Sequence, residues 1–595
     1  MDTHALLEVA PLVRQVGWII AALAGLAVIA RNESRAASTL GAQGRSMVVT
    51  RYGIVATSQA LASRAGAQVL ELGGNAIDAA IAANATLGVV EPYSDGIGGD
   101  LFAIVYEAKT GKLYGLNASG WAPTGLTPEL VRSRGFRTMP EEGILAVTVP
   151  GCVAGWDALR RRFGKLPLQT LLASAIHHAQ EGFPVTERIS AAWKEIESEG
   201  GKDAAYRQTF FPGGHAPQLG EIFRDPDLAA SLRRIAERGR DGFYKGQTAT
   251  AMVELSRRSG GTMVPADLSE FQPEWVDPIS TTYRGWTVSE LPPNGQGIAA
   301  LMMLNLMERF PLADYGQNST RALHVMIEAK KLAYADLLRY VADPRVSEVP
   351  VAGMLSKEHA EARAKLIDPA RAMSVATPSA AADLKSKRAG DTVYLSAIDR
   401  EGNIVSLIQS VYDSFGAKVV APGTGFALQN RGALFSLDAG HPNVLAPRKR
   451  PLHTIIPAFM SKGDVRIGFG IMGGWNQAQA HAQFVSNVVD FGMNIQAAIE
   501  APRFTKYTFE GVDVMIESRV PETTRSELTR LGHRLEVLDQ PFSARVGGGQ
   551  AVMSDGRGVH FGASDPRKDG AADPQGVPVT GKARAPAGRS RPTRR

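Results

Sequence analysis

The residue with the most distinctive chemical setting in this sequence is Thr392, which stands where a polar segment meets a strand. Residues 373–390 lack hydrophobic periodicity, which is typical of an exposed linker. Residues 392–398 and 404–411 are rich in strand-forming side chains and are joined by the turn 399–403, which predicts a β-hairpin. A linker therefore leads straight into the first residue of a buried hairpin.

Cleavage of the bond between Asp391 and Thr392 would leave Thr392 with a free α-amine beside its own hydroxyl. An α-amino group has an ordinary pKa of about 7.7–8.0, so part of it is neutral near pH 7 and can accept the hydroxyl proton. The hydroxyl could also attack the preceding carbonyl, so that no separate protease is needed. The alternative is that Thr392 merely begins a strand, where threonine is common, and the linker–strand pattern alone favours that alternative.

Two further groups of residues would support such a reaction. Gly473 and Gly474 follow the predicted strand 465–469, and adjacent glycines let backbone N–H groups approach a ligand, as an oxyanion hole requires. Polar residues at 428–432 and 449–454 stand at strand–loop borders beyond the hairpin. Taken singly, a glycine pair is more often a turn, and each polar group is more often a solvated edge.

The elements that must position these groups are indicated by hydrophobic spacing and by end signals. Strands joined by a turn are predicted at 101–106 and 113–117. Helices are predicted at 59–73, 76–87, 152–164, 167–182, 228–238 and 318–341.

Several motifs, taken in their order along the chain, resemble the γ-glutamyltransferase family. The hairpin 392–406, the triplet 449–451 and the pair Gly473–Gly474 look like the small subunit of these enzymes. The segments that look like the large subunit and the closing motif are 72–80, 96–102, 292–297 and 562–566. The resemblance runs from about residue 50 to residue 570 and points to a divergent branch of γ-glutamyltransferase-like amidohydrolases.

The resemblance implies an α+β fold, the αββα sandwich of the N-terminal-nucleophile hydrolases. It implies a precursor cut into a large subunit, residues 47–391, and a small subunit, residues 392–570, which remain together. Thr392 matches the nucleophile, and Ser410 stands where the family has a threonine that hydrogen-bonds it. Gly473 and Gly474 match the oxyanion hole, and neither a cofactor nor a metal is implied.

The substrate side departs from the family pattern. No basic residue lies in 117–123, where an arginine should hold the glutamate α-carboxylate, and the acid that should bind the α-amine falls on Leu434. A zwitterionic headgroup needs charge-assisted partners, so amide acyl transfer is better supported than γ-glutamyl specificity. The substrate-binding candidates are therefore Tyr412, Asn430, Arg431, His453 and Thr454, with Arg431 a hypothetical relocated carboxylate contact.

The function predicted is a self-processing enzyme that hydrolyses or transfers the acyl group of a γ-glutamyl-type amide, such as glutathione, through an acyl-Thr392 intermediate. One alternative is an amidohydrolase of another small acid amide, such as oxamate, or an acylase of the cephalosporin type with the same nucleophile. A second alternative is a non-catalytic binding protein on the same fold. A metal-dependent hydrolase is disfavoured because the 11 histidines include no HExxH or comparable spacing.

Composition and charge argue against other classes of protein. Hydrophobic residues make up 44% of the 595 residues, which is ample for a large core. The net charge of +6 arises almost wholly in residues 571–595, a tail with six basic residues and one acid that is predicted to be disordered. The body is near neutral and has no basic stripe, so no nucleic-acid partner is expected. The one cysteine, Cys152, cannot form an intramolecular disulfide and is expected to be buried.

The beginning of the chain allows two interpretations. Residues 16–30 are uncharged and mostly apolar, a length that suits a signal peptide or a short anchor better than a full membrane span. On that interpretation the protein is periplasmic or membrane-anchored. If translation instead starts near Met47, residues 1–46 are not made and the protein is cytoplasmic.

Overall fold

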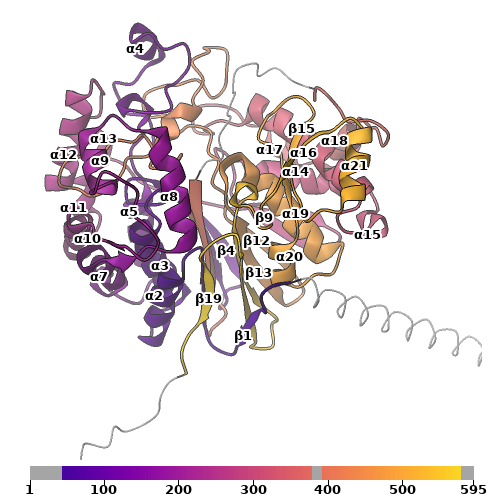
Figure 1. The fold of residues 1–595 in the computed structure, drawn as a ribbon, viewed down its shortest axis with the longest axis horizontal. Coiled ribbons are helices and arrows are strands. Elements are labelled where there is room, and N and C mark those ends of the chain that lie inside the picture. Colours follow the sequence, from indigo (N-terminus) through magenta and orange to yellow (C-terminus); the bar gives the residue numbers. More distant parts are fainter. Residues whose placement is uncertain (1–42, 378–390, 578–595) are drawn as a thin grey trace, which may run out of the picture.

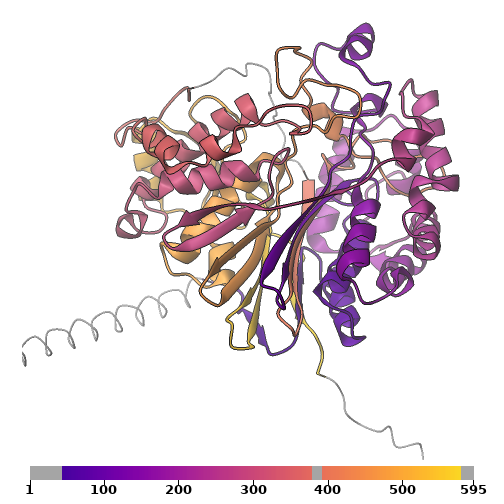
Figure 2. The same ribbon diagram turned by 180° about the vertical axis from the view of Figure 1, so that it is seen from behind.

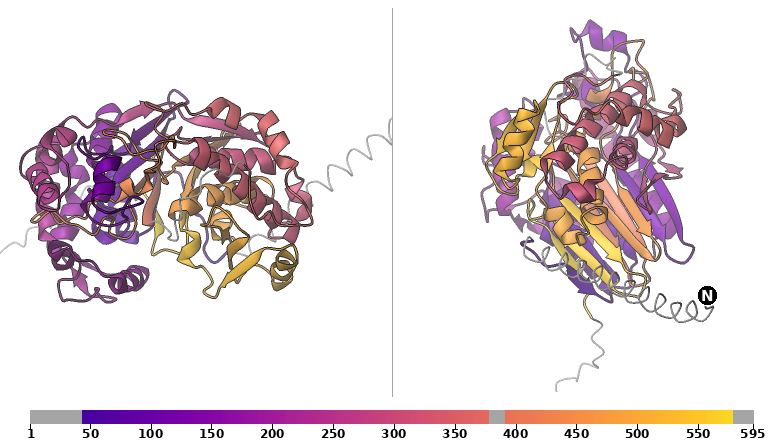
Figure 3. Two further views of the ribbon diagram at one scale, coloured as in Figure 1. Left: turned by 90° about the horizontal axis from the view of Figure 1, so that it is seen from above. Right: turned by 90° about the vertical axis from the view of Figure 1, so that its right-hand side faces the viewer.

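Two stacked β-sheets form the middle of the molecule, and helices cover the outer face of each (Figures 1 and 2). The structure is a computed structural model that describes residues 43–377 and 391–577. The four layers run helix, sheet, sheet, helix, and the view from above separates the two helical groups on either side of the sheets (Figure 3). The predicted αββα sandwich is confirmed.

The first sheet is wholly antiparallel, with the strand order β1-β18-β17-β13-β12-β9-β8. Its strands in that order are Val48–Thr50, His560–Ser564, Gly549–Ser554, Val465–Ile471, Ala458–Lys462, Trp286–Glu290 and Ile279–Tyr283.

The second sheet is also antiparallel, with the order β19-β2-β10-β11-β3-β4-β7. Its strands in that order are Ala571–Pro574, Ile54–Thr57, Asp391–Ile398, Ile404–Tyr412, Asp100–Glu107, Lys112–Ala118 and Glu274–Val276. Both sheets combine strands from before and after Thr392, so the two predicted subunits form one structural unit.

Helices α2, α3, α5, α7 and α10 lie on the side of the second sheet, and α14, α16, α19 and α20 lie on the side of the first (Figures 1 and 2). The bounds of the first group are Ala60–Glu71, Ala76–Val90, Cys152–Phe163, Ala173–Glu181 and Pro226–Arg238. The bounds of the second group are Gly297–Met307, Thr320–Tyr340, Gln477–Val489 and Ile495–Glu500.

The remaining elements are shorter or peripheral. The helices are α4 Pro128–Ser133, α6 Leu168–Leu171, α8 Glu187–Glu199, α9 Ala204–Phe210, α11 Asp241–Tyr244, α12 Gly246–Arg258, α13 Pro265–Ser269, α15 Leu312–Tyr315, α17 Val351–Met354, α18 Lys357–Ala364 and α21 Glu522–Arg530. The strands are β5 Phe183–Pro184 with β6 Ile222–Phe223, and β14 Phe504–Thr505 with β15 Asp513–Glu517 and β16 Arg534–Leu538.

The alternation of side chains along β10 shows how the layers are filled. Val393, Leu395 and Ala397 pack into the core shared with α3, whereas Tyr394 and Ile398 pack between the two sheets. Because successive strand residues point to opposite faces, one strand contributes to two cores. All of β10 beyond Asp391 is buried, as expected for a central strand covered on both faces.

Several sequence predictions differ from the structure in detail; the helix predicted at 76–87, for example, continues to Val90. The helix predicted at 167–182 is divided into α6 and α7 at Leu172. The helix predicted at 228–238 begins two residues earlier, at Pro226, because the Asp225 carboxylate caps it by accepting from the N–H of Leu228 at 2.8 Å. Residues 571–574, predicted to belong to the tail, form β19 and pair with β2.

The burial expected for Cys152 is found, since its side chain is fully enclosed. Among residues 43–377 and 391–577, no helix has the length and apolar character needed to cross a membrane. The predictions for residues 16–30 and for most of the linker and tail fall outside the described residues.

Candidate active site

The end of the β10–β11 hairpin brings Thr392 and Ser410 together. Asp391 pairs with Tyr412 whereas Val393 pairs with Gln409, so a bulge interrupts the ladder at Thr392. Bulges re-aim side chains and occur often beside active sites. Thr392 is buried, with 2% of its surface exposed.

Ser410 connects the Thr392 hydroxyl to the carbonyl that precedes it. The Thr392 Oγ1 donates to Ser410 Oγ at 3.3 Å, and Ser410 Oγ donates to the carbonyl oxygen of Asp391 at 2.7 Å. The backbone N–H of Tyr412 donates to the same serine oxygen at 2.7 Å. Ser410 therefore polarises the Asp391 carbonyl while holding the Thr392 hydroxyl beside it.

The Asp391 side chain is itself enclosed. Its carboxylate accepts a hydrogen bond from the Ser414 hydroxyl. Burial raises the pKa of Asp391 to about 6, and the hydrogen bond from Ser414 and the nearby ammonium of Lys568 oppose part of that rise. A buried carboxyl is thus placed directly before the predicted nucleophile.

A glycine loop from the other sheet approaches the same point. Strand β13 ends at Ile471, and Gly473 and Gly474 follow in left-handed conformations, with φ of 115° and 55°. Glycine adopts these angles without steric cost. They lead through a short 3₁₀ turn into α19, and the first N–H groups of such a helical segment have no partner within it.

A neighbouring loop holds this glycine loop in place. The Asn476 side chain donates to the carbonyls of Met472, at 3.2 Å, and Val546, at 2.9 Å. The N–H of Met472 donates to the carbonyl of Gly548 at 3.1 Å. Gly547, with φ of 75°, packs so closely that a Cβ there would lie 2.1 Å from the Met472 oxygen.

A cavity of about 460 Å³ opens onto these groups. Its wall includes Asp391, Thr392, Gly473 and Asn430. Of the predicted substrate contacts, Asn430 lies on this wall and is held by its neighbours: its Nδ2 donates to the Glu141 carbonyl at 2.7 Å. The nucleophile and one of the two predicted oxyanion glycines thus face one volume large enough for a small molecule.

The other predicted substrate residues lie behind that wall. Arg431, His453 and Thr454 are each 0% exposed. The Arg431 Nη1 donates to Thr454 Oγ1 at 2.7 Å, and its guanidinium lies 4.4 Å from the centre of the Tyr412 ring. None of these four side chains contributes to the cavity wall formed by the described residues.

The charges in this buried cluster centre on Asp100. Burial raises the pKa of Asp100 to about 6, although the nearby Arg431 cation lowers it. His453 Nε2 lies 3.0 Å from the Asp100 carboxylate, and its Nδ1 accepts from the N–H of Ile455 at 3.3 Å. Burial lowers the pKa of His453, so the ring is neutral and donates from Nε2.

Sequence reasoning missed one wall of the cavity, which helix α8 provides. Residues 188, 191, 192, 195, 196 and 199 line it at spacings of three and four, which places them on one helix face. Residues 567–568 line the cavity too, and they directly follow the recognised motif 562–566. The amphipathic spacing of α8 was a usable signal for a helix, but not for a cavity on its exposed side.

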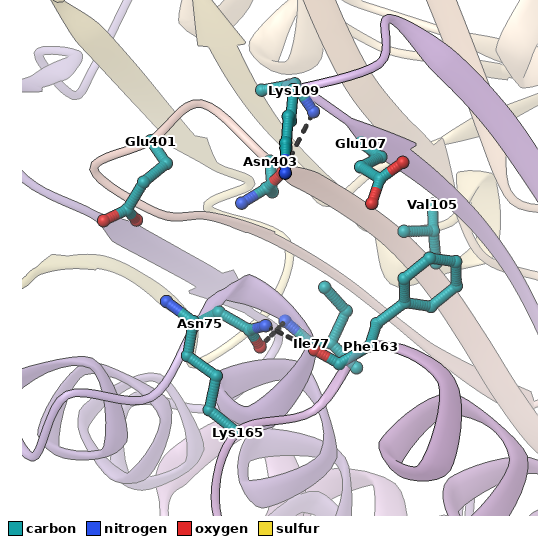
Figure 4. A pocket seen from close by; sticks show the side chains of 10 residues that line it. Asn75, Ile77, Val105, Glu107, Lys109, Phe163, Lys165, Glu401 and Asn403 are labelled. Atoms are coloured by element: carbon teal, nitrogen blue, oxygen red, sulfur yellow. Dashed lines mark hydrogen bonds between the residues drawn. The ribbon is translucent and has the colours of Figure 1, made fainter.

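Cavity size alone does not identify the site. A second cavity, of about 480 Å³, lies near the opposite end of the hairpin, beside its turn (Figure 4). Asn75 caps α3 there, and Asn403 accepts from the N–H of Ala108 at 2.9 Å. The side-chain amides that line this second cavity thus stabilise local turns, and Thr392 does not line it.

A buried histidine cluster lies on the far helical layer. One ligand atom each from His324, Glu328 and His533 fall within 4.8 Å of one another. The two rings are hydrogen-bonded to each other at 2.8 Å, and Lys331 Nζ donates to Glu328 at 2.7 Å. The carboxylate charge is therefore balanced by a lysine.

Comparison with known proteins places these features in a family. Residues 62–575 match the family described as Gamma-glutamyltranspeptidase. The chain is 36% identical over 535 residues to the Glutathione hydrolase-like YwrD proenzyme of Bacillus subtilis (strain 168), covering 89% of this chain and 99% of that protein. It is 35% identical over 534 residues to the Oxamate amidohydrolase proenzyme of Klebsiella pneumoniae, covering 88% and 98%. The crystal structure of cephalosporin acylase from Bacillus halodurans superposes with a TM-score of 0.82 at 43% identity, covering 89% of this chain and 97% of that one.

Proposed function

We propose that this chain, which belongs to the γ-glutamyltranspeptidase family, cleaves its own Asp391–Thr392 bond and then hydrolyses amides through an acyl ester on Thr392. The chain is a hydrolase of the N-terminal-nucleophile type, so the non-catalytic alternative is set aside. The observation that carries the proposal is the position of Ser410, hydrogen-bonded both to the Thr392 hydroxyl and to the Asp391 carbonyl.

Self-cleavage follows from that geometry. Thr392 Oγ1 attacks the carbonyl carbon of Asp391, and its proton passes to the amide nitrogen as the C–N bond breaks. The Ser410 hydroxyl stabilises the oxyanion by the hydrogen bond it already donates at 2.7 Å. The resulting ester between Asp391 and Thr392 Oγ1 is hydrolysed by water, which leaves a carboxylate on Asp391 and a free amine on Thr392.

The mature site would repeat this chemistry on a substrate amide. The Thr392 amine accepts the Oγ1 proton, Oγ1 attacks the substrate carbonyl, and the leaving amine departs with that proton. The N–H groups of Gly473 and Gly474 would stabilise the oxyanion, as expected of a glycine loop at the start of a helix. Water then hydrolyses the acyl ester and restores Thr392.

The acyl donor is the finer part of the proposal. Residues 117–123 contain no cation that could hold a glutamate α-carboxylate. Leu434, an apolar residue, stands where an acid would bind the α-amine. This favours an amide of another small acid over a γ-glutamyl amide. Similarity to an oxamate amidohydrolase and to a cephalosporin acylase points in the same direction.

The test is the polypeptide composition of the purified protein. Denaturing electrophoresis with intact mass should show two fragments for the wild type, one beginning at Thr392, and one uncut chain for Thr392→Ala. Thr392→Ser, which keeps a hydroxyl, should be cut more slowly. A wild-type chain that is folded and stays uncut for days would overturn the proposal.

Once cleavage is established, the substrate class can be tested with anilides. We expect hydrolysis of small-acid anilides to exceed that of the γ-glutamyl anilide in kcat/KM. The reverse order would restore the γ-glutamyl amide as the acyl donor.

A further inference from the structure

The wall of the cavity that faces Thr392 carries several cations, and all but one are already paired. Lys418 lies 2.8 Å from Glu142 and 3.3 Å from Glu199. Lys568 lies 2.8 Å from Glu91. The other paired cations in the wall are Arg567, bonded to Glu517 and Asp565, and Arg545, 2.6 Å from Glu536.

Arg188 is the exception among the described residues. It lines the cavity from α8, and within residues 43–377 and 391–577 its guanidinium has neither a hydrogen bond nor an ion pair. A guanidinium offers five N–H donors in a planar fork that matches a carboxylate. Its charge is therefore available to a ligand in the same volume as the nucleophile.

The backbone beneath Arg188 is fixed by the other predicted subunit. The Asp569 carboxylate accepts from the backbone N–H of Arg188 at 2.8 Å, from that of Ile189 at 3.2 Å, and from the hydroxyl of Thr186 at 2.6 Å. At its other end, α8 is held by the ion pair between Glu199 and Lys418. Arg188 thus projects from a helix anchored at both ends, so a ligand would have to order its side chain but not the backbone beneath it.

The cavity-facing side of α8 also provides space for a ligand and a second charge beside Arg188. Ala191 and Ala192 follow Arg188 on the cavity side, and Glu195 comes next, about 10 Å along the axis at about 1.5 Å per residue. The small side chains between the two charges leave space in the cavity that Thr392 also lines. The carboxylate of Glu195 would repel a substrate anion from that end and direct it toward Arg188.

We propose that Arg188 is the cation that recognises a carboxylate of the amide substrate, in place of the arginine that is missing from residues 117–123. This proposal rests on the proposed function of Thr392. It differs from the hypothesis that Arg431 makes the contact, because Arg431 is enclosed behind the wall and Arg188 lines it.

The test compares matched chromogenic amides. One pair is the mono-anilide of a dicarboxylic acid and its terminal carboxamide, which is the same length without charge. A second pair carries the carboxylate on the anilide ring or lacks it. Each pair gives a ratio of kcat/KM for the anion over the neutral compound, and the pair that responds identifies which half of the substrate bears the anion.

Arg188→Ala should lower the ratio in one pair by roughly tenfold to a hundredfold, the loss of a charge-assisted hydrogen bond. Arg188→Lys should recover part of it, and Arg188→Glu should lower it further. Lys194→Ala, an exposed cation elsewhere on α8 that does not line the cavity, is the control and should leave both ratios unchanged.

The outcomes separate this inference from the proposed function. Completed self-cleavage of the Arg188 variants shows that they fold and that Thr392 reacts. If the wild type hydrolyses the anilides and both ratios survive Arg188→Ala, this inference is wrong and the proposed function stands. If the wild type neither cleaves itself nor hydrolyses any anilide, the proposed function fails.

Discussion

Two polar regions of this molecule were both candidates for the substrate site, and the structure treats them differently. Around Thr392, the hairpin end, the glycine loop and α8 face a cavity. Around Asp100, the side chains of Arg431, His453 and Thr454 are enclosed and bonded to one another or to Asp100. The first region has polar groups that can still bind a ligand, whereas most polar side chains of the second region already bond to one another.

This contrast indicates that a polar residue predicted to bind substrate can instead be enclosed in the packing. A buried polar cluster is costly unless its members satisfy one another, so it specifies the local packing instead. Arg431 is satisfied only in part: its Nη1 donates to Thr454 and its charge is offset by the nearby Asp100, whereas its Nε and Nη2 find no hydrogen-bond partner among the described residues. We therefore expect the second region to support the wall of the first.

The largest effect should come from Arg431→Ala. Arg431 and Asp100 are not joined by an ion pair, but removing the cation leaves the Asp100 carboxylate in the interior without its compensating charge, and an uncompensated buried charge costs about 3–5 kcal/mol. Denaturant unfolding of the uncut Thr392→Ala precursor should show this loss, whereas Arg188→Ala in the same background should cost under about 1 kcal/mol.

The same variant distinguishes a packing role of Arg431 from a substrate-binding role. If Arg431→Ala kept its stability and instead lowered the anion-to-neutral ratio of kcat/KM tenfold, Arg431 would be the substrate contact, as the sequence suggested. The two regions would then exchange roles.

The sequence predicted the chemistry more sharply than the specificity, for a physical reason. Thr392 and Gly473 stand in local patterns, a strand start after a linker and a glycine pair after a strand; each pattern alone is ambiguous, and the family resemblance along the chain is what assigns their roles. Whether Arg431 or Arg188 reaches the ligand depends instead on which side chains cover it. That is decided by packing between segments more than 200 residues apart, as when Asp569 anchors the start of α8.

The next effect should be a pH-dependent one at Asp391. Burial raises its pKa from 3.8 to about 6, so the folded precursor favours the neutral acid. Only well below pH 3.8 is the group neutral in both folded and unfolded chains. As the pH rises from 3.8 to about 6 the unfolded chain ionises first, and above pH 6 the charge must be buried, so the precursor has then lost about 3 kcal/mol of stability.

Asp391→Asn in the Thr392→Ala background removes this cost. We expect the variant to be more stable than its parent by about 3 kcal/mol at pH 8 and by under about 1 kcal/mol at pH 4, as measured by denaturant midpoints. Asp464→Asn, an exposed acid, should have no effect at either pH. If Asp391→Asn raised the stability equally at both pH values, ionisation of Asp391 would not be the cause of the stability change.

The smallest effect should come from Gly547→Ala, which tests the support of the cavity-facing region alone. A Cβ at this position would lie 2.1 Å from the Met472 carbonyl oxygen and 2.7 Å from the Asn476 side-chain nitrogen, so the contact between the two loops must change, and we expect the glycine loop to shift. A displaced oxyanion hole should lower kcat by roughly tenfold to a hundredfold, or about 1.4–2.7 kcal/mol of barrier.

Gly558→Ala is the matched control, because Gly558 also has a left-handed φ, 80° against 75°, but nothing lies within 4 Å of its Cβ. Backbone strain is then common to both variants, and only the contact differs. Equal losses in kcat would mean that strain alone acts and that the Gly547 contact does not position Gly473 and Gly474.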